Sequence, residues 1–354
     1  EEKRIGFFIT SDSWSNFQRW HFNTAVALNE RGYNVVVIAP KKSKLYSRLR
    51  RKDIKVHPYK KNNLLLTDLL KLVKIINAHQ VQTLFISHHR DIVLSGFAKK
   101  MSQLEKLIFR RGTVSKIKIG PLNNFVIKNF VNSIITNSEA NKQRMLWKKK
   151  EALKETPIEV VYHGLNMNKY ELSLEKLSNP LKNGKLTIGI SNCSKDMDNC
   201  FALLNTINEH MDTDKYRFVI YQESNSPGLR GKINKMKPEK LRIQPYSGAN
   251  IKEFMESVDI YLSPVASHSF NYPLLYAMAY GRPVVGINKG SNLEIIEHGT
   301  NGFLIAKGDI YKLADILETL RNHEKRYEMG REAQRTIREK FNIEYSIDQI
   351  ESII

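Results

Sequence analysis

The stretch PVASHSFNYPLLYAMAYGRPVVGINKGSNLEIIEHGTNGFLI, residues 264–305, decides the fold that we expect for this chain. A strand end leads into an apolar helix start at 273–279, a Gly-Arg-Pro turn and a buried strand at 283–287. A Gly-Ser-Asn loop with Glu294 and a Gly-x-x-Gly pattern precede another apolar run. Alternating strands and helices with glycines at the strand ends are typical of nucleotide platforms in doubly wound folds. The stretch therefore predicts an α/β domain that binds a nucleotide.

The rest of the chain shows the same alternation. We expect strands at 4–10, 34–39, 82–87, 106–110, 133–137 and 158–162, and again at 186–191, 217–221, 241–244, 260–263, 284–287 and 302–305. Helical stretches between them favour parallel sheets covered on both faces. The polar segment 171–184 indicates a linker between two Rossmann-like domains, at 1–170 and 185–335. Two such domains that enclose a cleft bind ligands at the carboxyl ends of their strands.

The composition is that of a globular protein, since 41% of the 354 residues are hydrophobic and 26% are charged. No apolar run reaches the roughly 18 residues of a membrane-spanning helix. The only cysteines, Cys193 and Cys200, suit a reducing compartment better than a disulfide framework, so we expect a cytoplasmic protein. Two cysteines without clustered histidines also predict that the chain holds no metal and needs none.

The positive charge is concentrated in one half of the chain. Residues 1–174 contain 32 Lys and Arg against 13 Asp and Glu, whereas the other 180 residues contain 24 against 23. A basic half indicates an anionic partner, such as a lipid surface, a polyanionic substrate or nucleic acid. A bias of the genome towards lysine explains why lysine is common, but not why the excess stops near residue 174. No nucleic-acid motif accompanies the charge, and we expect no nucleic-acid partner.

Several short motifs, in order along the chain, resemble those of the retaining family 4 glycosyltransferases. They are ALNERGYNV at 27–35, IITNSEA at 134–140, YHGLN at 162–166 with Tyr170, the 264–305 stretch with Phe303, and REAQRTIREKF at 331–341. The resemblance implies the GT-B fold, in which the first domain binds the acceptor and the second binds a nucleotide sugar. It also implies transfer with retention of configuration and a C-terminal helix, 336–354, that packs back on the first domain. The nucleotide sugar would be a substrate, and no cofactor is expected.

The donor side departs from this family at two positions, because the usual pair of glutamates eight residues apart is His268 and Tyr276 here. Tyr276 could offer a hydroxyl or stack on the base, and His268 could donate to a sugar or phosphate oxygen; both could instead simply line the cleft. The family's phosphate-binding Arg and Lys correspond roughly to Asn192 and Lys195, although Lys195 could equally be a surface residue. The donor residues that we predict are Asn192, Lys195, His268, Phe270, Asn271, Tyr272, Tyr276, Gly290, Ser291, Asn292 and Glu294.

The acceptor side also departs from the family. Arg111 stands where a histidine usually follows the fourth strand, and an arginine stays protonated and cannot act as a general base. Arg110 and Arg111 would instead hold phosphate or an acidic acceptor. His88 and His89 end the preceding strand and could polarise a hydroxyl, or be ordinary loop residues. We therefore predict Arg111, His88, His89 and His268 as catalytic candidates, and Ser13, Trp14, Ser15, Asn16 and Arg110 as acceptor-binding candidates.

Two basic, apolar segments raise the question of a membrane surface. For 64–76 we expect the apolar stripe to face the core, whereas 115–130 fits a core helix or an interfacial helix. Several lysines near an anionic leaflet supply about 1 kcal/mol each. Family acceptors are often lipid-linked glycans, so we expect a glycan or lipid-linked acceptor and peripheral attachment to the inner face of the plasma membrane.

Three functions remain open. The favoured one is a glycosyltransferase of envelope glycans with an atypical donor site. The alternative is a catalytically degenerate GT-B scaffold that binds a glycan or a partner subunit, since both glutamates and the usual histidine are replaced. Against it, the glycine-rich framework from Gly281 to Gly302 is intact. The third, a glucosyltransferase that modifies nucleic-acid bases, has only the basic charge in its support.

Overall fold

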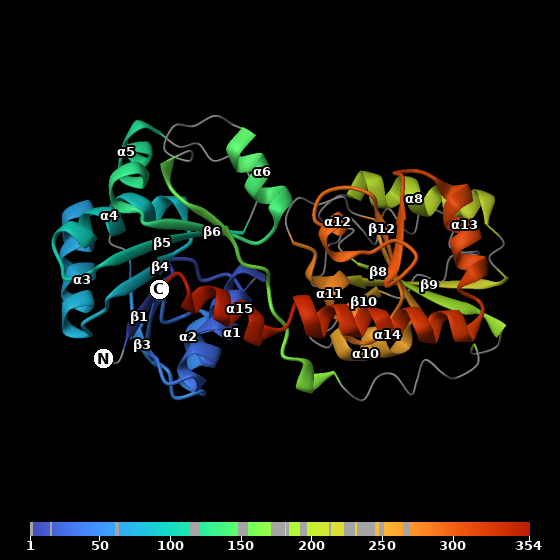
Figure 1. Ribbon diagram of the computed structural model, residues 1–354, viewed down its shortest axis with the longest axis horizontal. Coiled ribbons are helices and arrows are strands. Elements are labelled where there is room, and N and C mark those ends of the chain that lie inside the picture. Colours follow the sequence, from blue (N-terminus) through green and yellow to red (C-terminus); the bar gives the residue numbers. More distant parts are fainter. Residues whose placement is uncertain are drawn as a thin grey trace. The chain divides into compact units, whose positions relative to one another are not determined.

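The computed structural model describes residues 3–14, 16–60, 64–112, 120–147, 155–170, 181, 184–191, 197–211, 214–222, 231, 245–247, 251–264 and 270–354. The chain forms two compact units. Unit 1 contains Glu1–Gly164 and Ile343–Ile354, and unit 2 contains Leu165–Asn342. Each unit is a β-sheet with helices on both faces (Figure 1). The chain therefore passes from one unit to the other twice.

Unit 1 is built on a seven-stranded sheet in which every neighbouring pair is parallel. In spatial order its strands are β3 (Lys55–Pro58), β2 (Asn34–Ala39), β1 (Arg4–Phe8), β4 (Thr83–Ile86), β5 (Lys106–Arg111), β6 (Ser133–Thr136) and β7 (Ile158–Val160). The central strands are runs of Val, Ile, Leu and Phe because both faces of a parallel sheet are buried. Helices α1 (Asn16–Glu30), α2 (Lys44–Arg50) and α15 (Ile343–Glu351) cover one face. Helices α3 (Leu65–Ala78), α4 (Ile92–Lys100), α5 (Pro121–Phe130) and α6 (Glu139–Trp147) cover the other.

Unit 2 has the same architecture with a six-stranded parallel sheet. Its strands, in spatial order, are β10 (Pro245–Ser247), β9 (Tyr216–Gln222), β8 (Leu186–Ser191), β11 (Ile260–Ser263), β12 (Val284–Ile287) and β13 (Gly302–Ile305). The helices are α8 (Met197–His210), α10 (Ile251–Ser257), α11 (Tyr272–Ala279), α12 (Asn292–Ile295), α13 (Ile310–Thr319) and α14 (His323–Lys340). Buried Gln334 on α14 donates to the Ala279 carbonyl at the end of α11 (2.9 Å), which fastens these two helices together.

Both sheets reverse their strand order at the first strand, between β1 and β4 in unit 1 and between β8 and β11 in unit 2. Such a switch point at the carboxyl edge of a doubly wound sheet is where ligands bind. The prediction of two doubly wound α/β domains is confirmed. The short elements β3 and α2 were not predicted, because each is brief and lies between stronger apolar runs.

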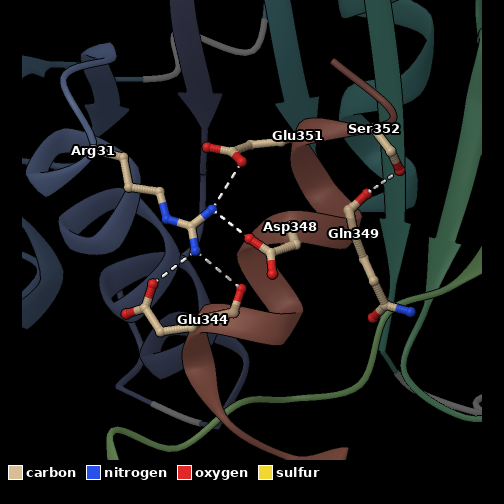
Figure 2. A network of polar contacts seen from close by, with 6 residues as sticks. All are labelled: Arg31, Glu344, Asp348, Gln349, Glu351 and Ser352. Carbon is tan, nitrogen blue, oxygen red and sulfur yellow. Dashed lines mark hydrogen bonds and ion pairs between the residues drawn. The ribbon is translucent and has the colours of Figure 1, made fainter.

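The last helix, α15, belongs to unit 1 although it follows directly on unit 2. One side of it carries Glu344, Asp348 and Glu351, which all accept from the Arg31 guanidinium at 2.7, 2.7 and 2.8 Å. Figure 2 shows this fan of carboxylates around the single arginine. The opposite side buries Ile347 and other isoleucines against α1 and the sheet. The helix is thus held by an apolar face and by one ionic cluster.

Two other sequence expectations are changed by the structure. The apolar stripe of α3 faces the core only in part, since Leu69 and Leu72 are buried whereas Leu65 and Leu66 are exposed. Cys200 is disulfide-bonded, which departs from the expectation that the cysteines suit a reducing compartment better than a disulfide framework. In the part of the chain that the structure describes, no helix has the length and apolarity to cross a bilayer.

The two contributions to α15 docking can be compared by mutation. We expect Ile347→Ala to lower the free energy of unfolding by about 2–4 kcal/mol, because it leaves a cavity in the core. Arg31→Ala removes ion pairs that are partly exposed and should cost only about 1 kcal/mol, less at high salt. Urea unfolding followed by tryptophan fluorescence measures both, since all three tryptophans lie in unit 1. A larger loss for Arg31→Ala would show that the ionic cluster dominates.

Candidate functional site

In unit 1 the polar side chains gather where the strands end. Ser87 and His88 follow β4, Arg110 and Arg111 are the last residues of β5, and His163 follows β7. Helix α1 adds Phe17 and His21 to the same group through ring contacts and hydrogen bonds. Parallel strands direct all their carboxyl ends to one edge, and this brings together residues up to 146 positions apart, from Phe17 to His163.

The centre of this group is a serine–histidine hydrogen bond. His21 Nδ1 lies 2.8 Å from the Phe17 carbonyl, and its Nε2 lies 2.8 Å from Ser87 Oγ. A carbonyl only accepts, so the bonding assigns the proton to Nδ1, and the Ser87 hydroxyl donates to Nε2. Burial lowers the pKa of His21 well below its ordinary value, and the Arg110 charge adds to this effect. A neutral, fully bonded imidazole orients the loop after β4 and is unsuited to take up a proton.

His88 is better placed for chemistry. Its ring lies 4.9 Å from the Phe17 ring, and its Nε2 is buried with no hydrogen-bond partner among the described residues. Burial lowers the pKa of His88, as do the nearby His89, Arg90 and Arg111 charges. The ring is therefore neutral near pH 7 and can accept from, or donate to, a hydroxyl. His89 is largely exposed, and its pKa is also lowered, by the burial of the remaining part of the ring and then by the Arg111 and Arg90 charges.

The two arginines are almost fully buried, at 2% exposure for Arg110 and 6% for Arg111. The Arg110 guanidinium lies 4.2 Å from the centroid of the Trp20 ring and 5.4 Å from that of Phe17. Burial lowers the pKa of Arg111, but an arginine remains charged at any physiological pH. These residues can hold an anion but cannot accept a proton.

The predicted acceptor loop lies between β1 and α1. Ser13 bonds to the Ser11 hydroxyl (2.9 Å), and Gln18 Nε2 donates to the Ser11 carbonyl (2.6 Å), so the start of the loop is tied to α1. The Trp14 ring lies under the Arg48 guanidinium, at 4.3 Å. Asn16 begins α1, and Ser15 lies outside the described residues.

In unit 2, two buried asparagines connect the ends of β11 and β12. Asn271 Nδ2 donates to Ser263 Oγ (2.6 Å) and approaches Asn292 Oδ1 at 3.5 Å. Asn292 Nδ2 donates to the Ile287 carbonyl (2.9 Å), and a Cβ at Gly286 would lie 3.2 Å from that nitrogen. The Asn292 side chain therefore holds the loop in place. Asn271 keeps one buried acceptor, Oδ1, with no hydrogen-bond partner among the described residues.

The other predicted donor residues are mostly packed. The Tyr276 ring lies 6.4 Å from the Tyr170 ring, which contacts Tyr280 in turn at 5.0 Å. Phe270 and Tyr272 are buried against each other. Beyond β12, Gly290 adopts a positive φ of 64° that favours glycine, Ser291 is buried, and Glu294 is half-buried on α12. The candidates Asn192, Lys195 and His268 lie outside the described residues.

Sequence reasoning missed Phe17, His21 and Ser87 as parts of the unit 1 group. A signal was present, because Phe17 and His21 are four residues apart at the start of the first predicted helix and so share one face. The spacing alone does not predict which strand these two side chains contact. Among the described residues, no three His, Cys, Asp or Glu side chains come together as a metal site.

Two doubly wound units, each with a switch point at the carboxyl edge of its parallel sheet, have the architecture of the GT-B fold. Comparisons with known proteins agree: a "Glycosyl transferase 4-like" model matches residues 4–137, and a "Glycosyl transferases group 1" model matches residues 186–323. The chain belongs to the family 4 glycosyltransferases of the GT-B fold.

Individual relatives are distant. An uncharacterized glycosyltransferase of Haemophilus influenzae is 23% identical over 99% of this chain and 100% of its own length. An N-acetyl-alpha-D-glucosaminyl L-malate synthase of Bacillus anthracis is 34% identical, over 29% of this chain and 28% of that protein. The crystal structure of Anabaena Alr3699/HepE with UDP and glucose has a TM-score of 0.79 and 18% identity over 99% of both chains, which shows a shared fold.

The buried histidines of unit 1 make its stability depend on pH. His21 and His163 both have a pKa well below 6.5, chiefly through burial and then through Arg110. Below about pH 6.5 these histidines are protonated in the unfolded chain but remain neutral in the folded chain. The free energy of unfolding therefore falls by up to about 1.4 kcal/mol per pH unit for each histidine. This stability is present above pH 6.5 and is lost on acidification.

We therefore expect His163→Gln to show a shallower loss of stability between about pH 7 and about pH 5 than the unmodified protein. Urea unfolding with tryptophan fluorescence gives the measurement. The control is His323→Gln, at an exposed position of unit 2, which should leave the slope unchanged. Parallel slopes for all three proteins would contradict the account of His163.

Proposed function

We propose that the chain transfers a sugar from a uridine diphosphate sugar to a glycan or lipid-linked acceptor of the cell envelope, with retention of configuration. Its membership of the family 4 glycosyltransferases carries this proposal. UDP is the nucleotide to test first, because the Anabaena relative with the same fold was crystallised with UDP and glucose.

The donor is assigned to the carboxyl edge of unit 2. There the buried Asn271 Oδ1 can accept one hydrogen bond from a ligand, and Asn271 itself is fixed by Ser263. Tyr276 replaces the family's ribose-binding glutamate. Its ring packs near Tyr170, so its hydroxyl is held in a limited range of positions and can make one bond where a carboxylate makes two.

The acceptor is assigned to unit 1, where His88 makes the hydrogen bond to the attacking hydroxyl. The new bond forms between the acceptor oxygen and the anomeric carbon as the bond from that carbon to the phosphate oxygen breaks. The hydroxyl proton passes to a phosphate oxygen of the leaving diphosphate. His88 therefore orients and polarises the hydroxyl, and Arg111 supplies charge and takes no proton.

Calorimetric titration with UDP, GDP, CMP, ADP and dTDP tests the donor assignment. We expect UDP to bind with a Kd on the order of micromolar. Tyr276→Ala should weaken UDP about tenfold, and Tyr276→Phe, which keeps the ring against Tyr170, separates the hydroxyl from the ring. If only Tyr276→Ala weakens UDP, the ring acts by packing and the assigned hydroxyl bond is wrong.

His88→Gln tests the acceptor assignment in unit 1, as the Tyr276 variants test the donor assignment in unit 2. It should leave the affinity for UDP unchanged and reduce the turnover of UDP-glucose about 100-fold. A folded protein that binds none of the five nucleotides would favour the alternative, a GT-B scaffold without catalysis.

A second observation favours attachment to a membrane. At the start of α3, Leu64, Leu65 and Leu66 are 64%, 56% and 66% exposed, and Leu122 and Phe125 on α5 are each about half exposed. Helix α4 lies between α3 and α5 (Figure 1), and all three run from the carboxyl edge of the sheet. Exposed leucines on the basic unit suit an anionic lipid surface. The predicted cytoplasmic location on the inner face of the plasma membrane rests on this proposal.

Flotation with phosphatidylglycerol-containing vesicles, compared with phosphatidylcholine alone, tests the attachment. We expect binding to the anionic vesicles that weakens at high salt. The double change Leu65→Gln and Leu66→Gln should reduce it at least tenfold, because a fully inserted leucine contributes about 1.5–3 kcal/mol of apolar burial. Leu293→Gln, at a similarly exposed leucine of unit 2, is the control. Equal flotation of both variants would contradict the assigned surface.

A further inference from the structure

The segment 41–55, which follows β2 and contains α2, carries a high density of positive charge on its surface. Eight of its residues are Lys or Arg, and one, Asp53, is acidic. All eight basic side chains are exposed. They form the basic strip, which consists of Lys41, Lys42, Lys44, Arg48, Arg50, Arg51, Lys52 and Lys55.

The protein itself does not neutralise these cations. In the part of the chain that the structure describes, none of the eight side chains forms an ion pair. Lys44 begins α2, whose first turn has no acidic residue, although the amino end of a helix favours negative charge. Lys44 and Arg48 are four residues apart on this helix, where like charges repel. The arrangement is thus unfavourable for α2 alone, and an anionic ligand would relieve the repulsion.

The basic strip is charged but not apolar. Leu45, Leu49 and Ile54 are buried against α1 and the sheet, and no exposed large hydrophobic side chain of the described residues lies in the strip. The exposed leucines assigned to the membrane belong to α3 and α5, which cover the opposite face of the sheet. Interfacial membrane segments combine cations with exposed apolar side chains. A surface with cations alone therefore favours a water-soluble polyanion.

The basic strip begins beside the predicted acceptor loop. Lys41 and Lys42 follow β2 at the carboxyl edge of the sheet, where doubly wound folds bind ligands. The loop between β1 and α1 lies at the same edge, and its Trp14 ring has the Arg48 guanidinium 4.3 Å from its centroid. The strip and the acceptor loop are therefore in direct contact.

From this edge the basic strip continues along α2. Lys44, Arg48 and Arg51 are spaced i, i+4 and i+7, which places them on one side of the helix over about 10 Å of its axis. Helix α2 packs against α1 and β3 (Figure 1), and Lys55 begins β3 at the amino edge of the sheet. The strip thus extends from the ligand edge along the outside of unit 1.

We propose that the acceptor is an extended chain with repeating anionic groups, and that the basic strip binds the part of this chain beyond the unit that receives the sugar. This inference rests on the proposed function, in which unit 1 binds the acceptor. The anionic groups are the carboxylates of an acidic glycan or the phosphodiesters of a polyol phosphate. Cations spread along a surface match charges repeated along a chain, whereas a single small anion contacts only one or two of them. Exposed ion pairs are individually weak, so the affinity grows with the number of units bound.

Oligomers of one length test the proposal on the full chain. The anionic probes are octamers of galacturonate and of glycerol phosphate, and maltooctaose is the neutral probe. Galacturonate and glycerol 3-phosphate are the single units. Fluorescence anisotropy measures the affinity of labelled octamers, and competition measures that of the unlabelled probes. We expect an anionic octamer to bind at least about tenfold more tightly than its own single unit and than maltooctaose, and less tightly as salt is raised. The tighter of the two octamers identifies the anionic group.

Two triple variants locate the binding. The strip variant is Lys44→Gln, Arg48→Gln and Arg51→Gln together. The control variant is Lys71→Gln, Lys74→Gln and Lys100→Gln together, at exposed positions of α3 and α4 on the opposite face of the same sheet. The strip variant should weaken the anionic octamer about tenfold, since it removes three exposed pairs. The control removes the same net charge and should change the affinity less than about twofold. Neither should change the affinity for UDP.

Several results would overturn the proposal. Equal losses in the strip and control variants would show that only the net charge of unit 1 acts. An anionic octamer that binds no more tightly than its single unit, or than maltooctaose, would exclude an extended anionic acceptor. Oligothymidylate of the same length bound as tightly as the anionic octamers would assign the strip to nucleic acid. A strip variant that loses flotation with phosphatidylglycerol vesicles but keeps its affinity for the octamers would assign the strip to the membrane.

These results leave the proposed function standing as long as UDP binds. Failure of UDP itself to bind would refute that function, whatever the octamers do.

Discussion

A parallel sheet must be covered by helices on both faces, because its strands are apolar on both sides and consecutive strands can be joined only by crossover connections. Both units follow from this constraint. The crossovers return each strand in the same direction, so every strand of a unit ends at one edge. Polar residues that follow these apolar strands therefore lie close together in the structure, although they are far apart in the sequence. The grouping of Ser87, Arg110 and His163 is a consequence of topology before it is one of chemistry.

Within unit 1, burial has different effects on the charge of the histidines and of the arginines that lie at this edge. The pKa of a buried histidine falls through the physiological range, so His21, His88 and His163 become neutral. A buried arginine also has its pKa lowered, but from a value so high that it stays charged. The edge therefore combines neutral hydrogen-bonding rings with permanent cations. A site of this kind can orient a hydroxyl and neutralise an anion at the same time.

The end of the chain shows which force holds an element in place. Arg31 binds three carboxylates of α15, yet these pairs are partly exposed and water competes with them. The isoleucines on the other face, such as Ile347 and Ile350, are fully buried. Burial of an isoleucine contributes about 1.5–3 kcal/mol, more than an exposed ion pair. We therefore expect the apolar face to contribute more of the free energy that holds α15 in place than the ionic cluster does.

The sequence alone determined the α/β class, the two Rossmann-like domains and the family, because apolar periodicity and glycine positions are local properties that survive without a structure. Strands such as 34–39 and 284–287 were predicted at the observed residues, β2 and β12, since their Val and Ile runs are buried on both faces. The candidates Arg110, Arg111 and His88 were also found, as polar residues at strand ends. Only the tertiary structure decided their surroundings. Strand order brought His21 to Ser87 and placed Arg110 against Trp20, contacts between residues 66 and 90 positions apart. No local sequence pattern predicts such pairs, because they depend on the order in which the crossover connections place the strands in the sheet.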